Sequence, residues 1–292
     1  MTDLICYQTL PRWNSATLPP AWRQPYRTEP GCWAQPKLYK GTLDLALLTE
    51  LGEITETLTL TADSRPPRLA PEQLHRVIGY SPDVECQLAL YCKPEDYYHH
   101  RYQLTPTHSE VMEAAKIIPP GRVLDLGCGN GRNVLYLHQE GFEVEGWDKN
   151  SDSLNGLRQI IATEELEGIR LQQCDLNQVK IEKQYDFLLS TVVMMFLQPE
   201  TIPGLIGQMQ QATAPGGHNL IVAAMSTPDY PCPMPFPFTF SRSELLGYYD
   251  GWDILKYNEN PGALHKTDAQ GNRIKLRFAT LLARKPREGV KR

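Results

Sequence analysis

Three glycines alternate with other residues at Gly127, Gly129 and Gly131, directly after a short apolar run and before a segment with helical spacing. This order is typical of a buried strand that enters a tight turn, where a ligand can approach the backbone without meeting a Cβ atom. Asp125 lies at the end of the apolar run, where a carboxylate repels a pyrophosphate and attracts a cation. The pattern therefore predicts a site for a nucleotide-like ligand that carries positive charge.

The glycine spacing argues against a dinucleotide. A G-x-G-x-x-G fingerprint would place its third glycine at position 132, which is Arg132. S-adenosylmethionine carries a sulfonium and an ammonium but no phosphate, so an acidic residue before the turn suits it. Asp148 ends the next predicted strand, near the position from which an acidic residue binds ribose hydroxyls. We therefore predict S-adenosylmethionine as the cofactor.

Two further predicted strands end in polar residues. Asp175 follows the strand 169–173, and Ser190 and Thr191 end the strand 185–190. The carboxyl ends of parallel strands share one edge of a sheet, so these residues belong beside Asp125. Asp175 could accept a hydrogen bond from the adenine amino group, or it could only cap a turn, and both interpretations remain open on the sequence alone.

A sheet covered by helices is needed to bring these strand ends together. After residue 107 the apolar spacing alternates between helix and strand, which is the signature of an α/β sheet with both faces covered. The predicted strands are 123–126, 143–147, 169–173, 185–190, 219–225, 252–257 and 274–284, and the predicted helices are 109–118, 132–140, 153–162, 199–212 and 242–249.

Two segments outside these elements could cover the site. Segment 226–238 has proline at nearly every second position, which excludes a helix or a central strand. We expect an extended loop that acts as a lid against water. Segment 97–107 carries three tyrosines and an arginine. It either closes over the site or serves as a linker with aromatic anchors, and the sequence favours neither.

The first 92 residues have a different character. Short β-type runs at 37–40, 43–48, 54–60 and 86–91 are separated by proline-containing turns, which predicts a small all-β sandwich or barrel. The stretch 69–77 resembles a metal-binding motif of cupin-like barrels, but the other ligands of that motif are missing. Too few donors remain for a metal site. We therefore expect His75 to be a hydrogen-bonded residue of the barrel, and we predict no metal.

Charge and cysteine usage exclude several classes of function. The 292-residue chain has a formal net charge of -5, which argues against nucleic acid or an anionic membrane surface as the main partner. The first ten residues lack a signal-peptide pattern, and no apolar run reaches the length of a membrane span. Seven cysteines occur without a C-x-x-C pair. This predicts reduced thiols in the cytoplasm and disfavours dithiol redox catalysis.

Four stretches resemble the TehB-type tellurite-resistance methyltransferases, namely 125–133, 190–193, 220–225 and 271–280. The resemblance also includes the proline-rich segment, and the N-terminal region resembles the small β-domain of the longer family members. It implies a class I methyltransferase with a Rossmann-like sheet of seven strands whose last strand is reversed. It further implies S-adenosylmethionine-dependent methylation of tellurium and selenium oxyanions, or of related soft nucleophiles, in metalloid detoxification.

The predicted organisation has three parts. They are a small all-β, cupin-like sandwich or barrel at 1–92, a class I methyltransferase domain at 93–285 and a basic tail at 286–292. The polar, proline-marked stretch after residue 92 sets the first boundary. A homo-oligomer is compatible with this organisation.

The resemblance also assigns the site residues. The cofactor-binding positions are Tyr102, Asp125, Gly127, Cys128, Gly129, Asn130, Asn133, Asp148, Lys149, Asp175, Leu176 and Thr191. The catalytic positions are three basic residues on the last hairpin, His265, Lys266 and Arg273, which would hold the oxygens of tellurite or selenite. The family's His-Arg pair stands here as His265 and Lys266, and lysine lacks the planar fork for a bidentate contact.

Other functions remain open. A methyltransferase could act on another small molecule, such as a thiol or a thiopurine. A reductase that uses NAD(P)H is opposed by the glycine spacing and by Asp125. A sensor that binds S-adenosylmethionine without catalysis would differ from the enzyme only in forming no product.

Overall fold

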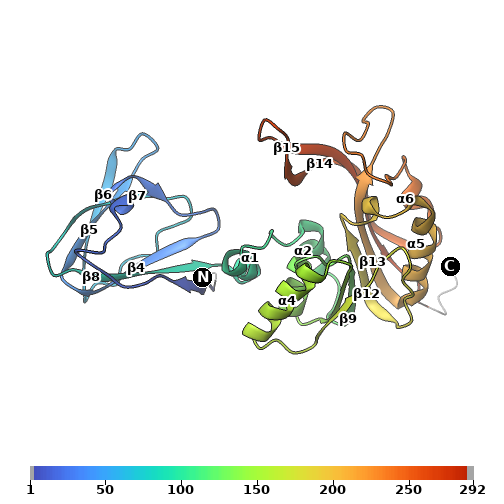
Figure 1. The fold of residues 1–292 in the computed structure, drawn as a ribbon, viewed down its shortest axis with the longest axis horizontal. Helices are drawn as coiled ribbons and strands as arrows, with labels where there is room; N and C mark the ends of the chain where they lie inside the picture. Colours follow the sequence, from blue (N-terminus) through green and yellow to red (C-terminus); the bar gives the residue numbers. More distant parts are fainter. Residues whose placement is uncertain (1–2, 288–292) are drawn as a thin grey trace. The chain divides into compact units, whose positions relative to one another are not determined.

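The computed structural model describes residues 3–287, apart from the side chains of His265 and Lys266. The chain forms two compact units, Met1–Pro106 and Thr107–Arg292, and each is described by itself (Figure 1). The division falls later than the predicted break at residues 92 and 93. Helix α1 (Tyr97–Tyr102) packs on strand β1 (Ile5–Thr9), and the Arg101 guanidinium donates to the Tyr7 carbonyl at 3.1 Å.

The N-terminal unit consists of two antiparallel sheets. In the first, β8 (Glu85–Cys92) pairs with β1, β2 (Trp13–Asn14) and β4 (Trp33–Lys40). The second has the order β3 (Tyr26–Arg27), β7 (Leu74–Tyr80), β5 (Thr42–Leu48) and β6 (Ile54–Thr61). Two 3-10 turns, η1 (Pro20–Arg23) and η2 (Pro94–Asp96), complete the unit. One apolar core joins residues of both sheets, so the predicted all-β fold is confirmed as a sandwich.

A seven-stranded sheet forms the centre of the C-terminal unit. Its order is β11 (Ile169–Gln173), β10 (Glu143–Asp148), β9 (Arg122–Leu126), β12 (Tyr185–Thr191), β13 (Thr213–Met225), β15 (Arg273–Arg284) and β14 (Asp253–Thr267). Strands β9 to β13 are parallel to one another, whereas β15 is antiparallel to both β13 and β14. The predicted class I sheet with its reversed last strand is therefore confirmed.

Helices cover both faces of this sheet. They are α2 (Ser109–Ala115), α3 (Arg132–Gln139), α4 (Ser151–Thr163), α5 (Ile202–Ala212) and α6 (Glu244–Gly247), with 3-10 turns η3 (Met194–Phe196) and η4 (Pro199–Thr201). Figure 1 shows α4 and α5 on opposite faces. The chain runs from β9 to β10 and β11 on one side, then returns to β12 on the other side of β9. Such a reversal of strand order is where open α/β sheets bind ligands.

The last two strands are longer than the sequence predicted. β14 continues to Thr267, so the predicted connection 262–273 is mostly strand. The turn itself is short, with Asp268 and Asn272 joined by a backbone hydrogen bond of 2.8 Å. Pro261 lacks a backbone N–H group and therefore argues against a strand at this position in the sequence. β14 is an edge strand, however, and an edge position tolerates the missing N–H group.

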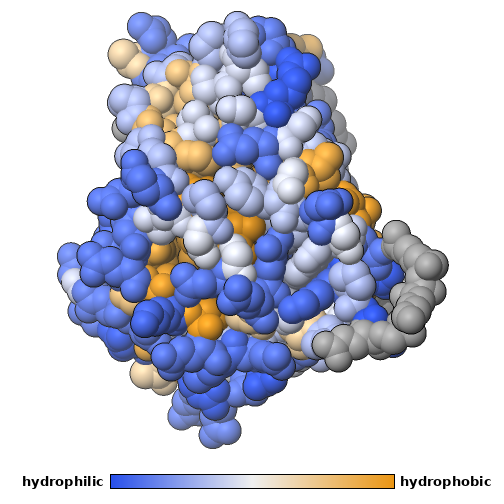
Figure 2. Space-filling view, turned by 90° about the vertical axis from the view of Figure 1, so that its right-hand side faces the viewer, coloured by the Kyte–Doolittle hydropathy of each residue, from blue (hydrophilic) through white to orange (hydrophobic). Residues whose placement is uncertain are grey.

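Side chains on one face of the molecule differ in hydropathy (Figure 2), and the described helices can be compared with the length of a membrane span. Within residues 3–287, no helix is long and apolar enough to cross a membrane. The face shown in Figure 2 is mainly hydrophilic, with hydrophobic side chains in small separate areas. A broad apolar area of the kind that obligate partners bury is not visible on this face.

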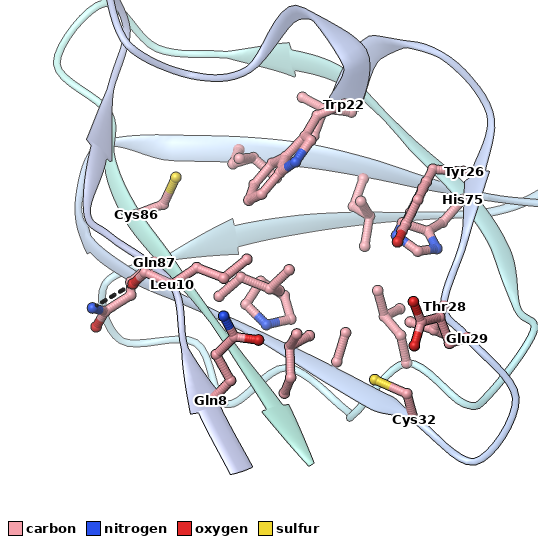
Figure 3. Close-up of a pocket in the computed structure, with 18 of the residues that line it drawn as sticks. Gln8, Leu10, Trp22, Tyr26, Thr28, Glu29, Cys32, His75, Cys86 and Gln87 are labelled. Atoms are coloured by element: carbon pink, nitrogen blue, oxygen red, sulfur yellow. Dashed lines mark hydrogen bonds between the residues drawn. The ribbon is translucent and has the colours of Figure 1, made fainter. Parts of the chain in front are cut away.

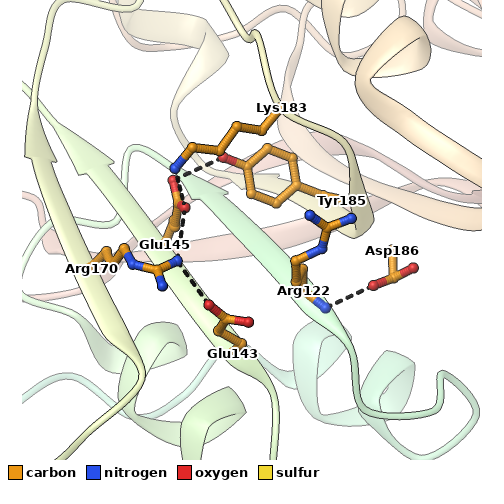
Figure 4. Close-up of polar contacts among 7 residues, drawn as sticks. All are labelled: Arg122, Glu143, Glu145, Arg170, Lys183, Tyr185 and Asp186. Carbon is orange, nitrogen blue, oxygen red and sulfur yellow. Dashed lines mark hydrogen bonds and ion pairs between the residues drawn. The ribbon is translucent and has the colours of Figure 1, made fainter.

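Charged residues gather at the amino ends of the parallel strands (Figure 4). The buried Glu145 carboxylate accepts from Lys183 Nζ at 2.7 Å and from the Tyr185 hydroxyl at 2.9 Å. Arg170 lies 3.5 Å from Glu145 and 2.8 Å from Glu143. Burial raises the pKa of Glu145, but the hydrogen bonds from Lys183 and Tyr185 outweigh burial and hold that pKa below its ordinary value. The ionised carboxylate therefore stabilises this end of the sheet.

We expect Glu145→Ala to lower the free energy of unfolding by about 1 to 3 kcal/mol, because the buried Tyr185 loses its acceptor. Since folding lowers the pKa of Glu145, its contribution is present above the ordinary value of 4.5 and is lost as the pH falls. Urea unfolding at several pH values measures both effects. Glu143→Ala is the matched control, because its ion pair is exposed and contributes less than about 1 kcal/mol. Equal losses in the two variants would contradict this role of Glu145.

The whole seven-stranded sheet lies within residues 107–292. We therefore predict that chains of residues 94–292 and 107–292 each fold without the N-terminal sandwich. Thermal unfolding followed by circular dichroism is expected to show one cooperative transition in each chain. Insoluble chains, or chains that melt without cooperativity, would mean that the two units share a core.

Candidate cofactor site

The glycine turn connects β9 to α3 at the carboxyl edge of the sheet. All three glycines have positive φ, +81° at Gly127, +53° at Gly129 and +86° at Gly131. A Cβ atom at Gly127 would lie 2.4 Å from the Val193 side chain, and one at Gly131 would lie 2.4 Å from Leu157. By contrast, a Cβ atom at Gly129 would meet no described atom within 4 Å. Gly127 and Gly131 therefore permit close packing, while the open side of Gly129 is left for a ligand.

Asp125 is a buried carboxylate directly below this turn. It is 1% exposed, and within the described part of the chain neither of its oxygens has a hydrogen-bond partner. Burial raises the pKa of Asp125 to about 7, and the Asp148 carboxylate adds to the rise, against the opposing effects of the Arg132 charge and of the nearby Asn133 amide. An unpaired buried carboxylate is costly. The ammonium group of an S-adenosylmethionine would supply the missing partner, so Asp125 fits this cofactor.

Asp148 connects the turn to the next strand. Its Oδ2 atom accepts from the Gly129 N–H and its Oδ1 atom from the Asn150 N–H, both at 2.8 Å. Carboxylate oxygens can accept more than one hydrogen bond each, so both remain able to accept from ribose hydroxyls. The Trp147 carbonyl also accepts from the N–H groups of Gly127 and Cys128. The end of β10 thus fixes the shape of the turn.

A cavity of about 340 Å³ opens beside Asp148. It is lined by Gly127, Asp148, Lys149, Cys174, Asp175, Leu176, Val192, Val193, Phe196 and Leu197. The carboxyl ends of β10, β11 and β12 thus contribute to one pocket, and its walls are mainly apolar, as an adenine ring requires. Four of the predicted cofactor residues besides Asp148 lie in this lining.

The family model described as "Tellurite resistance protein TehB" matches residues 90–282, and the model described as "TehB-like domain" matches residues 8–88. This chain belongs to the TehB family. A curated TehB relative from Haemophilus influenzae (strain 10810), named "Probable S-adenosyl-L-methionine-dependent methyltransferase TehB", is 47% identical over 285 residues, with 97% of this chain and 99% of the relative covered. "Hemagglutinin 1" of Eikenella corrodens is 42% identical over 239 residues, with 82% and 79% covered.

The fold agrees with a solved TehB structure. The structure titled "Crystal Structure of TehB from Haemophilus influenzae" has a TM-score of 0.90 and 48% identity, and the match covers 97% of this chain and 99% of that one. The predicted resemblance to the TehB family, including its N-terminal β-domain, is therefore confirmed.

The remaining predicted cofactor residues of this TehB-family chain have different positions. Buried Asn133 donates to Thr191 Oγ1 at 3.0 Å and accepts from the His108 N–H at 3.2 Å, so it ties α3 to the end of β12. Cys128 is buried beneath the turn, and Asn130 is exposed on it. Tyr102 belongs to the N-terminal unit, so its role in cofactor binding stays a prediction.

Asp175 caps a turn, which is one of the two roles that the sequence left open. Its Oδ1 atom accepts from the N–H and the side-chain amide of Asn177, both at 2.9 Å, so the carboxylate caps a turn. These hydrogen bonds lower the pKa of Asp175. Asp175 also lines the 340 Å³ cavity, and a contact with adenine stays a prediction.

Val192 lines the cavity, and the sequence analysis did not single it out. Its φ of +61° is in the left-handed region, which β-branched residues rarely adopt. The Val192 N–H donates to the Val222 carbonyl at 2.6 Å, which helps to hold this conformation. The bend directs Val193 under Gly127. No sequence pattern predicts a left-handed conformation at a valine.

The hairpin of β14 and β15 is described in part. The Arg273 guanidinium donates from Nε to the Leu264 carbonyl at 2.9 Å and from Nη2 to the Ala263 carbonyl at 3.3 Å. The side chains of His265 and Lys266 lie outside the described residues. A common acceptor site of the three basic residues therefore stays a prediction.

Arg277 was missed by the sequence analysis. Its Nη1 atom donates to Thr227 Oγ1 and to the Asp229 carboxylate, both at 3.1 Å, and its Nε atom is buried without a partner among the described residues. Hydrogen bonds from Thr227 and Arg277 hold the pKa of Asp229 at about 2. Arg277 thus attaches the extended proline-rich loop to β15. The available signal was an arginine between two large apolar residues, Leu276 and Phe278, in the predicted last strand.

Cofactor affinity is expected to rise between about pH 6 and pH 7.5. With its pKa raised to about 7, Asp125 must lose a proton to pair with an ammonium, so binding weakens by up to about tenfold per pH unit below that pKa. Calorimetric titration with S-adenosylmethionine measures the slope. Asp125→Asn should abolish it, whereas Asp152→Asn, at an exposed acid in α4, should preserve it. An unchanged slope in Asp125→Asn would exclude this pairing.

Proposed function

We propose that this chain transfers the methyl group of S-adenosylmethionine to a tellurium or selenium oxyanion or a related soft nucleophile. The enzyme class and the cofactor that the sequence predicted are those of the named TehB relatives. The observation that carries the proposal is Asp125, a buried carboxylate below a glycine turn whose two oxygens accept no hydrogen bond of good geometry from the described residues. A cationic nucleoside satisfies this group, whereas a dinucleotide would add negative charge beside it.

The residues of the site have separate tasks in this proposal. Asp125 pairs with the ammonium of the cofactor, Asp148 accepts from its ribose hydroxyls, and Leu176 with the neighbouring apolar walls holds the adenine. The cofactor supplies a methyl group already activated by its sulfonium. The chain therefore needs only to align the acceptor, neutralise its oxygens and exclude water. A lone pair on selenium or tellurium needs no general base.

The acceptor is proposed to bind at the hairpin of β14 and β15. Tellurite and selenite carry electron-rich oxygens, and the basic residues His265, Lys266 and Arg273 would pair with them. The central atom then keeps its lone pair for the methyl group. The contacts of Arg273 with the carbonyls of Ala263 and Leu264 support this proposal, because they order the backbone beside His265. Metalloid detoxification in the cytoplasm is the biological role that this activity would serve.

The test uses methyl-labelled S-adenosylmethionine with selenite, tellurite, small thiols and thiopurines. We expect volatile label with selenite and tellurite. Label on a thiol or a thiopurine alone would keep the methyltransferase and change its acceptor. Cofactor binding without any labelled product would indicate a sensor instead of an enzyme.

A further inference from the structure

The N-terminal sandwich encloses a cavity of about 210 Å³ (Figure 3). Its walls come mainly from alternate residues of four strands, namely Ala34 and Pro36 of β4, Leu43 and Leu45 of β5, His75 and Val77 of β7, and Cys86, Leu88 and Leu90 of β8. The polar side chains of Gln8, Gln87 and Gln103 also line it. Successive side chains of a strand point to opposite faces. The cavity is therefore formed by the facing inner surfaces of the two sheets.

The cavity is larger than ordinary packing leaves. Protein interiors are close-packed, and few of their voids exceed the size of a water molecule. Short side chains such as Ala34 and Cys86 leave the space open, while Trp22 covers part of it (Figure 3). An apolar cavity of about 150 Å³ holds benzene. A cavity of 210 Å³ therefore fits a slightly larger ring system of about nine non-hydrogen atoms.

The charges around the cavity exclude an anionic ligand. Among the described residues that line it, none is a lysine or arginine, and Glu29 is the only acidic one. A selenite or tellurite ion would have no cation to pair with and would meet the Glu29 carboxylate. This cavity is therefore not a second acceptor site. An uncharged ligand with an apolar body matches the lining.

His75 supplies a specific polar contact. Its Nδ1 atom lies 2.8 Å from the Gln73 carbonyl, and a carbonyl only accepts, so Nδ1 carries the hydrogen. Burial lowers the pKa of His75, which keeps the ring neutral. Nε2 is then an acceptor, and no described residue donates to it. Tyr26 packs edge-on against the ring, with the ring centroids 5.8 Å apart, and fixes its orientation.

We propose that this cavity binds a small, uncharged cyclic molecule that donates one hydrogen bond to His75 Nε2. The apolar walls take up the ring, and the imidazole selects for an N–H or O–H group. The site does not depend on the methyltransferase proposal, because all its residues belong to the N-terminal unit.

The test uses the full chain and three probes, which are indole, benzofuran and selenite. Indole and benzofuran have nearly the same size, but only indole donates a hydrogen bond. Isothermal calorimetry is expected to show indole bound about tenfold more tightly than benzofuran, the effect of one neutral hydrogen bond. Selenite should not displace indole, because the cavity offers it no cation.

Three variants locate the binding. His75→Phe keeps an aromatic ring and removes the acceptor, so indole and benzofuran should bind with equal affinity. Ala34→Leu fills the cavity and should weaken both by at least about tenfold. Ile78→Ala, at an exposed neighbour of Val77 on β7, is the control and should change neither. Unchanged circular dichroism and thermal unfolding of the N-terminal sandwich would show that each variant is folded.

Two results would overturn the proposal. One is the absence of indole binding to the parent chain. The other is a His75→Phe variant that still prefers indole about tenfold, which would place the ligand elsewhere. Should Ala34→Leu fail to fold, the loss of preference in His75→Phe still decides the question.

Discussion

Arg273→Ala is expected to lower turnover on selenite or tellurite by roughly 10- to 1000-fold, the range for the loss of one electrostatic donor in a site that excludes water. Cofactor affinity should change little, since no residue of the 340 Å³ cavity belongs to the hairpin. The guanidinium also donates to the carbonyls of Ala263 and Leu264, so its loss would loosen the hairpin as well. Initial rates with labelled S-adenosylmethionine, combined with calorimetry of cofactor binding, separate the two quantities.

Arg273→Lys is the matched variant, because it keeps the charge and removes the planar fork. A large loss in this variant would indicate that the two carbonyl contacts matter, and a small loss would indicate that charge is sufficient. His265→Ala should reduce turnover less at high pH than near neutrality if the charged imidazole binds the anion. Should Arg273→Ala and His265→Ala both act on selenite at the parent rate, the acceptor must be held elsewhere.

Asp148→Ala is expected to weaken S-adenosylmethionine binding by about 2 to 3 kcal/mol, roughly 30- to 150-fold, through the loss of charged hydrogen bonds in a partly buried site. The variant also removes the acceptor for the N–H groups of Gly129 and Asn150. Calorimetry on the folded variant measures the change. Asp152→Ala removes an exposed acid in the same region and should leave the affinity unchanged. Unchanged affinity in Asp148→Ala would remove Asp148 from the site.

The cofactor site was predictable because its signals are local. The apolar run of β9, the glycine spacing and the acid that ends β10 all lie within 26 residues, from Val123 to Asp148, and the structure brings them together as the spacing predicted. Glycine has a distinct conformational role at each of these positions, so the turn can be identified without knowledge of the rest of the chain.

Other features depend on contacts between distant residues. Strand β7 was not predicted because 69–77 resembled a metal-binding motif, and its place in the sheet comes from pairing with β5. The contact of Arg101 with the Tyr7 carbonyl joins residues 94 positions apart. The left-handed conformation of Val192 is imposed by the end of β12 and by its neighbour β13. Sequence periodicity reports which face of an element is buried but not which element covers it.

The hydrogen bonds of the Asp148 carboxylate also affect the entropy and the rate of cofactor binding. Because both of its oxygens accept backbone N–H groups, the chain's own hydrogen bonds hold the shape of the glycine turn. Binding then loses little entropy through ordering of the loop, and encounter can lead to the complex without a slow rearrangement of the turn. The glycine turn is therefore a preorganised part of the cofactor site. Motions slower than binding at this turn would belong to the hairpin of β14 and β15 or to the proline-rich loop.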